Sequence, residues 1–154
     1  MVGLHPVLAH FAVVLPVVTL LMGLYHLRMK TETSFNYTLV AAILAMLSII
    51  AAWYTGGIDG KAAYEGLVMG KDGGTEELIE HKNLGTVLAL FFVAIVVMLK
   101  VAAVKSNKYL MYIAITSLVV SVGLTFVQGK HGGELVYEYA ANVELPVEDD
   151  EDFE

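Results

Sequence analysis

Four histidines are the residues of this chain best suited to chemistry, because imidazole carries protons and binds both metals and haem. His5 and His10 stand at the start of a long apolar run, and His81 and His131 stand beside two later runs. On a straight helix, positions five apart differ by ~140° in direction and ~7.5 Å in height. His5 and His10 therefore cannot both face one small target, so they serve different partners or only one of them is a ligand.

The elements that must position these histidines are four apolar segments. The chain has 154 residues, of which 57% are hydrophobic, and its mean hydropathy is +0.69, as in a protein that crosses a membrane several times. Apart from Lys100 in the third segment, the segments contain no Asp, Glu, Lys or Arg. Each is close to the ~20 residues that a helix needs to cross the hydrocarbon core. The predicted spans are residues 6–27, 36–56, 84–104 and 109–127.

The fold class predicted from these spans is all-α, an integral membrane four-helix bundle. Residues 1–143 form the bundle, and residues 144–154 form an acidic tail that we expect to be disordered. Thr55-Gly56-Gly57 is expected to end the second span. Four spans place both termini on one side of the membrane, together with His5, His10, His81 and His131.

Charge predicts which side that is. The two short connections, near residues 28–35 and 100–108, have a net charge of +4. The opposite side has a net charge of −11, and the two sum to −7 for the whole chain. Short basic loops stay in the cytoplasm. We therefore expect a multi-pass protein of the cell inner or plasma membrane with both termini outside the cytoplasm, in contact with lipid and without a nucleic-acid partner.

Histidines gathered at one end of an apolar bundle fit two kinds of site. In a b-type cytochrome, imidazoles from two helices bind haem iron from either side. We expect one or two haems, with His10 and His81 as the first ligand pair and His5 and His131 as the second. Gly85 lies on the same helix face as His81 and would let the ring approach, while Lys82 and Lys130 could meet the haem propionates.

The other kind of site is a bare metal centre. The same four histidines could bind Zn or Cu together with carboxylates such as Asp59 or Glu65. A third possibility is a membrane anchor without a cofactor, which holds a redox enzyme and has its histidines at the interface. The chain has no Cys, which excludes disulfides, thiolate-bound Fe–S clusters and covalent c-type haem.

Four stretches also resemble a widespread prokaryotic family of small four-helix membrane proteins of unknown function. They are His5-Pro6-x-x-x-His10-Phe11, the glycines after span two, His81-x-x-x-Gly85, and Gly132-Gly133-x-Leu135-Val136-Tyr137. The resemblance covers roughly residues 4–143. Ala12 replaces a Pro that often follows the His-Phe pair, and Tyr139 stands where relatives often carry His.

The resemblance implies a role in electron transfer, because such domains are often joined to, or found beside, cytochrome c or Rieske-type modules. It therefore favours haem b over a bare metal. It also implies an extracytoplasmic redox partner such as a cytochrome c, or membership of a larger complex. We expect an electron carrier or complex subunit rather than a stand-alone enzyme, since the redox chemistry would belong to the cofactor.

Overall fold

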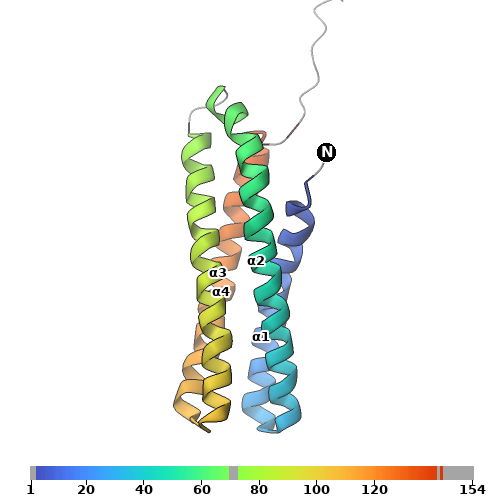
Figure 1. Ribbon diagram of the computed structural model, residues 1–154, viewed down its shortest axis with the longest axis vertical. Helices are drawn as coiled ribbons and strands as arrows, with labels where there is room; N and C mark the ends of the chain where they lie inside the picture. Colours follow the sequence, from blue (N-terminus) through green and yellow to red (C-terminus); the bar gives the residue numbers. More distant parts are fainter. Residues whose placement is uncertain (1–2, 70–72, 142, 144–154) are drawn as a thin grey trace, which may run out of the picture.

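The computed structural model is a bundle of four long helices and describes residues 3–69, 73–141 and 143. The helices run side by side along the long axis of the molecule (Figure 1). No strand occurs in the part of the chain that the structure describes. The helices are α1 (His5–Met29), α2 (Glu32–Met69), α3 (Gly74–Val104) and α4 (Lys108–Tyr137).

The order of the helices around the bundle follows their order in the chain. Each helix packs against its neighbours in the sequence, and α1 closes the ring by packing against α4. The pairs α1–α3 and α2–α4 are therefore the diagonals. We call the end where α1 and α3 begin the histidine end, and the end with the short α1–α2 and α3–α4 connections the basic end (Figure 1).

Local sequence explains where the helices begin and end. Pro6 lies in the first turn of α1, where its missing N–H costs nothing. The side chain of Asn107 caps α4 by accepting from the backbone N–H groups of Tyr109 and Leu110 at 3.0 and 3.1 Å. Lys30 ends α1 in the left-handed conformation, which allows the sharp turn into α2.

The inside of the bundle contains many small residues together with a few large ones such as Phe92, Ile95 and Leu99, whereas many other large apolar residues face outward. Ala42, Ala45 and Ala114 are fully buried, whereas Leu90 on α3 is 70% exposed. All four helices are long and apolar enough to cross a membrane. Small residues let helix backbones approach closely, and lipid tails cover the large residues that face outward. The fold class predicted from the sequence, a four-helix membrane bundle, is confirmed.

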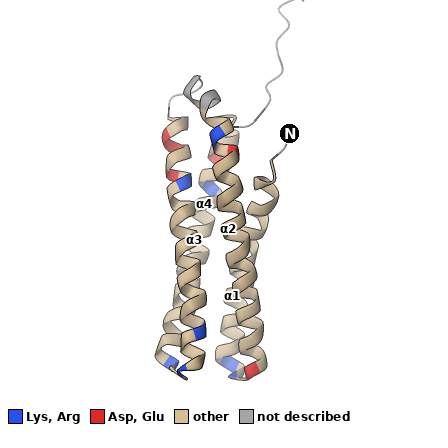
Figure 2. Cartoon of the chain, viewed as in Figure 1, with Lys and Arg blue, Asp and Glu red and all other residues tan. Residues whose placement is uncertain are grey.

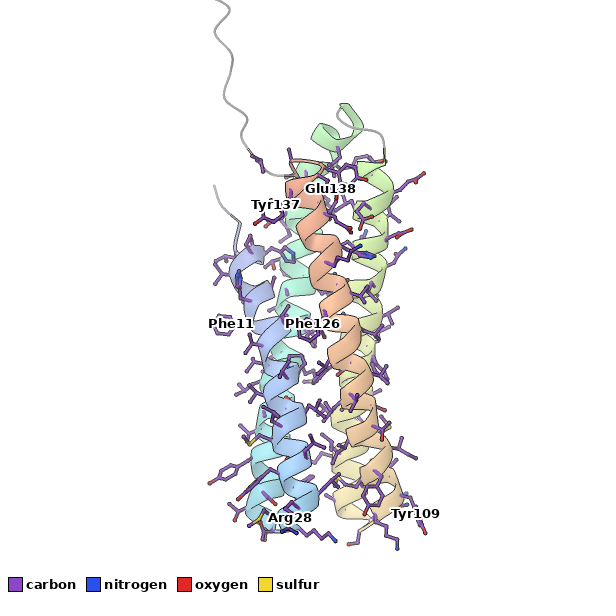
Figure 3. The ribbon with its side chains drawn as sticks, turned by 180° about the vertical axis from the view of Figure 1, so that it is seen from behind. Phe11, Arg28, Tyr109, Phe126, Tyr137 and Glu138 are labelled. Atoms are coloured by element: carbon purple, nitrogen blue, oxygen red, sulfur yellow. The ribbon has the colours of Figure 1, made fainter. Side chains whose placement is uncertain are left out.

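Charged residues are confined to the two ends of the bundle, and the middle carries none over most of its length (Figure 2). Figure 3 shows Arg28 and Tyr109 at the basic end and Tyr137 and Glu138 at the histidine end. Phe11 and Phe126 are 54% and 60% exposed. This distribution is typical of a bundle whose centre lies in hydrocarbon.

Buried hydroxyl groups in the apolar core donate to backbone carbonyls. Thr19 donates to the carbonyl of Leu15, and Thr38 donates to Ser34 within its own helix and to Met22 across the α1–α2 interface. These bonds remove the cost of burying a polar group away from water. The bond from Thr38 to Met22, at 2.9 Å, also joins two helices.

The structure differs from the sequence-based expectation at the second and fourth helices. α2 does not end at Gly56 and Gly57 but continues to Met69, and α4 continues through Gly129, Gly132 and Gly133 to Tyr137. A glycine inside a helix costs about 1 kcal/mol, which packing against neighbouring helices can outweigh. The expected acidic tail, residues 144–154, lies outside the described residues.

Candidate functional site

A cavity of about 440 Å³ lies at the histidine end, between the four helices. Its size is within the range of small-molecule and cofactor sites. Glycine and apolar side chains form most of its wall, with a few polar groups among them. Those that could act on a bound group are His5, His10, Lys61, His81, Lys82 and Gln128.

His5 and His81 meet across the α1–α3 diagonal of the bundle. Their ring centroids are 6.2 Å apart and their planes are 89° apart. His5 is the first residue of α1, and His81 lies two turns into α3. The structure thus brings His5 to His81, where the sequence had suggested His10.

The ring of His5 is held by α2. Its Nδ1 donates to the carbonyl oxygen of Ala52 at 2.9 Å. Because a carbonyl can only accept, the proton of the neutral ring is on Nδ1 and the lone pair on Nε2 is free. The ring also packs on Gly56, where a Cβ would come within 2.8 Å of Cε1. Gly56 is therefore the residue on α2 that makes room for His5.

The ring of His81 is held by α4. The side-chain nitrogen of Gln128 donates to the carbonyl oxygen of His81 at 2.9 Å and lies 3.2 and 3.1 Å from ring atoms Nδ1 and Nε2. A Cβ at Gly132 would be 3.2 Å from Cε1 of His81. The two rings thus have matching surroundings: each contacts a glycine on one of the other two helices.

His10 lines the same cavity but bonds to its own helix. Its Nδ1 donates to the carbonyl oxygen of Pro6, one turn earlier, at 2.6 Å, and the residue is exposed. This bond satisfies one ring nitrogen without help from another helix. His10 is therefore at the edge of the site, next to the pair formed by His5 and His81.

His131 is on α4, next to the Gly132 that packs on His81, and its ring contacts a carboxylate. Its Nδ1 is 3.3 Å from Oε1 of Glu77 on α3, and Glu134 is close to both. The remaining histidine, His26, is at the basic end, where its Nδ1 is 3.0 Å from Oγ of Ser34. Of the four histidines singled out from the sequence, the structure places three at the cavity and one beside a carboxylate.

Of the two lysines expected near a bound group, one lines the cavity and the other lies outside it. Lys82 lines the cavity, and so does Lys61 on α2. Lys130 instead pairs with Glu134 on its own helix at 2.7 Å and is largely exposed. Gly85 lines the cavity one turn after His81, and a Cβ there would be 3.2 Å from Nε2 of Gln128.

A family model described as "Predicted membrane protein (DUF2231)" matches residues 2–145, nearly the whole chain. The chain belongs to this family. Comparisons with curated proteins and with solved structures found no match. The family description and the four apolar helices both indicate a membrane protein, in agreement with the prediction from the sequence.

Two groups of the site were not found by reading the sequence. Gln128 follows an apolar span and looks like the first residue of a polar tail, whereas it contacts His81 from within α4. Lys61 lies after the glycine pair that was expected to end the second span. The one feature of the sequence that could have indicated them is that both are polar residues within one or two turns of an apolar span.

An apolar cap lies further toward the histidine end. Ala63 and Leu67 of α2 and Leu135 of α4 are buried there together, and Leu78 and Tyr139 pack against them. A hydrogen bond from Trp53 to Thr86, at 2.9 Å, joins α2 to α3 beside the cavity. These contacts hold the ends of the helices together and give the cavity a defined shape.

Proposed function

We propose that this protein is a membrane cytochrome of the b type that holds one haem between His5 and His81. The observation that carries the proposal is the approach of these two rings across the bundle at 6.2 Å between centroids. Two imidazoles on opposite sides of one metal, with metal–nitrogen bonds near 2 Å, have centroids about 6 Å apart. The pair therefore has a spacing that would let both histidines hold one haem.

The surroundings of the pair also support haem. The ligands come from one diagonal, and the other diagonal supplies glycines to the cavity wall: Gly56, Gly57 and Gly60 from α2, and Gly129 and Gly132 from α4. A flat macrocycle between the rings needs helices that approach without side chains in the way. The bond from His5 to the Ala52 carbonyl leaves Nε2 available, as is usual for histidine ligands.

Charge and chemistry fit the same cofactor. Lys61 and Lys82 at the cavity could pair with the two propionates. When bound, haem supplies a one-electron redox couple, and the protein supplies the ligands, the apolar surroundings and the access route. Haem held by His5 and His81 would supply electron transfer and no site for a substrate, so the protein would be a carrier rather than a stand-alone enzyme.

We also propose that the histidine end faces away from the cytoplasm. The basic end has five Lys or Arg residues and one Glu in its two connections, which favours retention in the cytoplasm. The acidic histidine end would then face soluble redox partners outside, such as a basic cytochrome c, or a subunit of a larger complex.

The first test is the visible spectrum of the detergent-purified protein before and after reduction with dithionite, with haem quantified per chain. We expect a low-spin bis-histidine spectrum and one haem per chain. His81→Ala should lose the haem, and His5→Ala should lose it or become high-spin. His26→Ala, a histidine at the opposite end, should keep it.

Other outcomes would contradict the proposal in distinct ways. A colourless protein, made with ample haem, would favour the cofactor-free membrane subunit. Two haems per chain would bring His10 and His131 back as ligands. Full haem content in the His5→Ala/His81→Ala double variant would place the cofactor elsewhere.

A further inference from the structure

Glu77, His131 and Glu134 form a second group of possible ligands, separate from the pair of His5 and His81. One ligand atom from each residue lies within 4.8 Å of the other two. Glu77 is in the first turn of α3, and His131 and Glu134 are three residues apart on α4. Residues three apart share a helix face, so α4 presents both toward Glu77.

Two atoms of this group, one from Glu77 and one from His131, face each other in a long ion pair. Oε1 of Glu77 and Nδ1 of His131 are 3.3 Å apart, and both are inaccessible to solvent. Neither atom has a hydrogen-bond partner within the described ranges. Buried polar atoms almost always have a hydrogen-bond partner, so two buried ligand atoms whose contact with each other is not a hydrogen bond are a place where an ion can bind.

The spacing fits a transition metal. Two ligands at about 2.0 Å from a tetrahedral zinc ion lie about 3.3 Å apart, which is the separation seen between Glu77 and His131. Imidazole together with carboxylates is a usual ligand set for divalent zinc, manganese and iron. Some four-helix bundles bind metals with a Glu and a His three residues apart on one helix and a Glu from another helix, and here the order on α4 is reversed, with His131 before Glu134.

The charges near the group also favour a cation. Two carboxylates and a neutral imidazole carry a charge of −2, and Lys130 neutralises Glu134 only from the surface, through an ion pair whose lysine is 72% exposed. Exposed pairs of this kind contribute little. A divalent ion can therefore take the lone pairs of Glu134 while Lys130 turns toward water.

We infer that Glu77, His131 and Glu134 bind one divalent first-row transition-metal ion, which ties α3 to α4 at the histidine end. Three protein ligands leave a fourth position of a tetrahedral ion open to water. The site shares no ligand with the haem proposed above, since it does not use His5 or His81.

Zinc is the probe for the test. Purified protein freed of metal with a chelator is titrated with Zn²⁺ against a chromophoric competitor, and Co²⁺ is used to report the geometry through its visible absorption. We expect one tightly bound ion per chain and an intense tetrahedral cobalt band. Glu77→Gln, His131→Gln and Glu134→Gln should each weaken binding at least tenfold.

Matched controls are Glu80→Gln on α3 and Glu138→Gln directly after the end of α4, which change exposed carboxylates near the group. They should bind zinc like the original chain. Size-exclusion profiles and helical circular dichroism show whether each variant is folded.

Three results would overturn the inference: no zinc bound by the folded protein, equal losses in the control variants, or binding that survives the three substitutions but is lost in His5→Ala/His81→Ala. The last result would place the metal between those two histidines and would also contradict the haem proposal. Loss of zinc binding with haem retained, in contrast, separates the two sites.

Discussion

The chemistry of the histidine pair depends on a few atoms around each ring. The carbonyl of Ala52 determines which nitrogen of His5 carries the proton, and Gln128 holds the backbone and the ring of His81. Outer contacts of this kind orient a ligand and raise its basicity. The absence of a Cβ at Gly56 and at Gly132 is as important, because each ring packs closely against the place where that atom would be.

This arrangement predicts the effect of adding one methyl group. In Gly56→Ala the new Cβ would meet Cε1 of His5 at 2.8 Å, and in Gly132→Ala it would meet Cε1 of His81 at 3.2 Å. The ring of His5 must shift in the first variant and the ring of His81 must give slightly in the second, so we expect haem content to fall severalfold in Gly56→Ala and less in Gly132→Ala. The measurement is haem per chain, by absorbance, in the purified variants.

The controls for this prediction are Gly123→Ala and Gly133→Ala, where a Cβ would meet nothing within 4 Å. Neither glycine lines the cavity. Both variants should keep their haem, and their helices should be stabilised by about 0.5–1 kcal/mol, because alanine is the better helix former. Unchanged spectra in Gly56→Ala and Gly132→Ala would mean that the ligands do not use this space.

At the scale of the helices, the packing depends on small residues in the core. Ala45 of α2 is fully buried, while Leu47, two residues later, is 54% exposed on the outer surface. Ala45→Leu inserts a larger side chain between packed helices and should lower the free energy of unfolding by about 1–3 kcal/mol. Leu47→Ala should change it by less than about 0.5 kcal/mol.

Thermal unfolding in a mild detergent, followed by circular dichroism, compares these two variants with the original chain. A larger loss in Leu47→Ala than in Ala45→Leu would show that the surface assigned to lipid is buried, for example against another subunit. Equal and small effects would mean that the bundle interior is loosely packed around Ala45.

The helices themselves could be predicted because hydropathy is a local property: each apolar run is long enough to span a membrane by itself. The end of α2 could not be predicted, because Gly56 and Gly57 are typical of a helix end. They are helical in the structure, where α2 packs against neighbouring helices. The histidine end was predicted from the topology. The partner of His81 was not predicted, because the position of the His5 ring depends on its hydrogen bond to the carbonyl of Ala52 on α2.

At the scale of the whole molecule, charge is strongly separated between the two ends. The sequence on the side of the histidine end carries −11, and residues 144–154 hold seven of the 16 acidic residues of the chain. A field of this sign attracts basic proteins and raises their rate of association. The same charge would also keep this end of the protein hydrated if no partner binds there. Attraction of a basic partner is therefore tested by measuring the rate of association.

We expect the rate of electron exchange with a basic soluble cytochrome c to fall at least tenfold between about 10 mM and 300 mM salt, because screening shortens the reach of the field from ~30 Å to several Å. Removal of residues 144–154 should lower the rate at low salt and weaken its salt dependence. A rate that does not change with salt would exclude attraction by the acidic end.

The orientation of the bundle in the membrane can be tested with single cysteines, since the chain contains none. Glu138→Cys places an exposed thiol at the histidine end, and Thr33→Cys places one at the basic end. If the basic connections stay in the cytoplasm, a maleimide that cannot cross membranes should label Glu138→Cys in intact cells. Thr33→Cys should react only after the membrane is opened. The reverse pattern would place the histidine pair on the cytoplasmic side, and the electron partners would then have to be sought there.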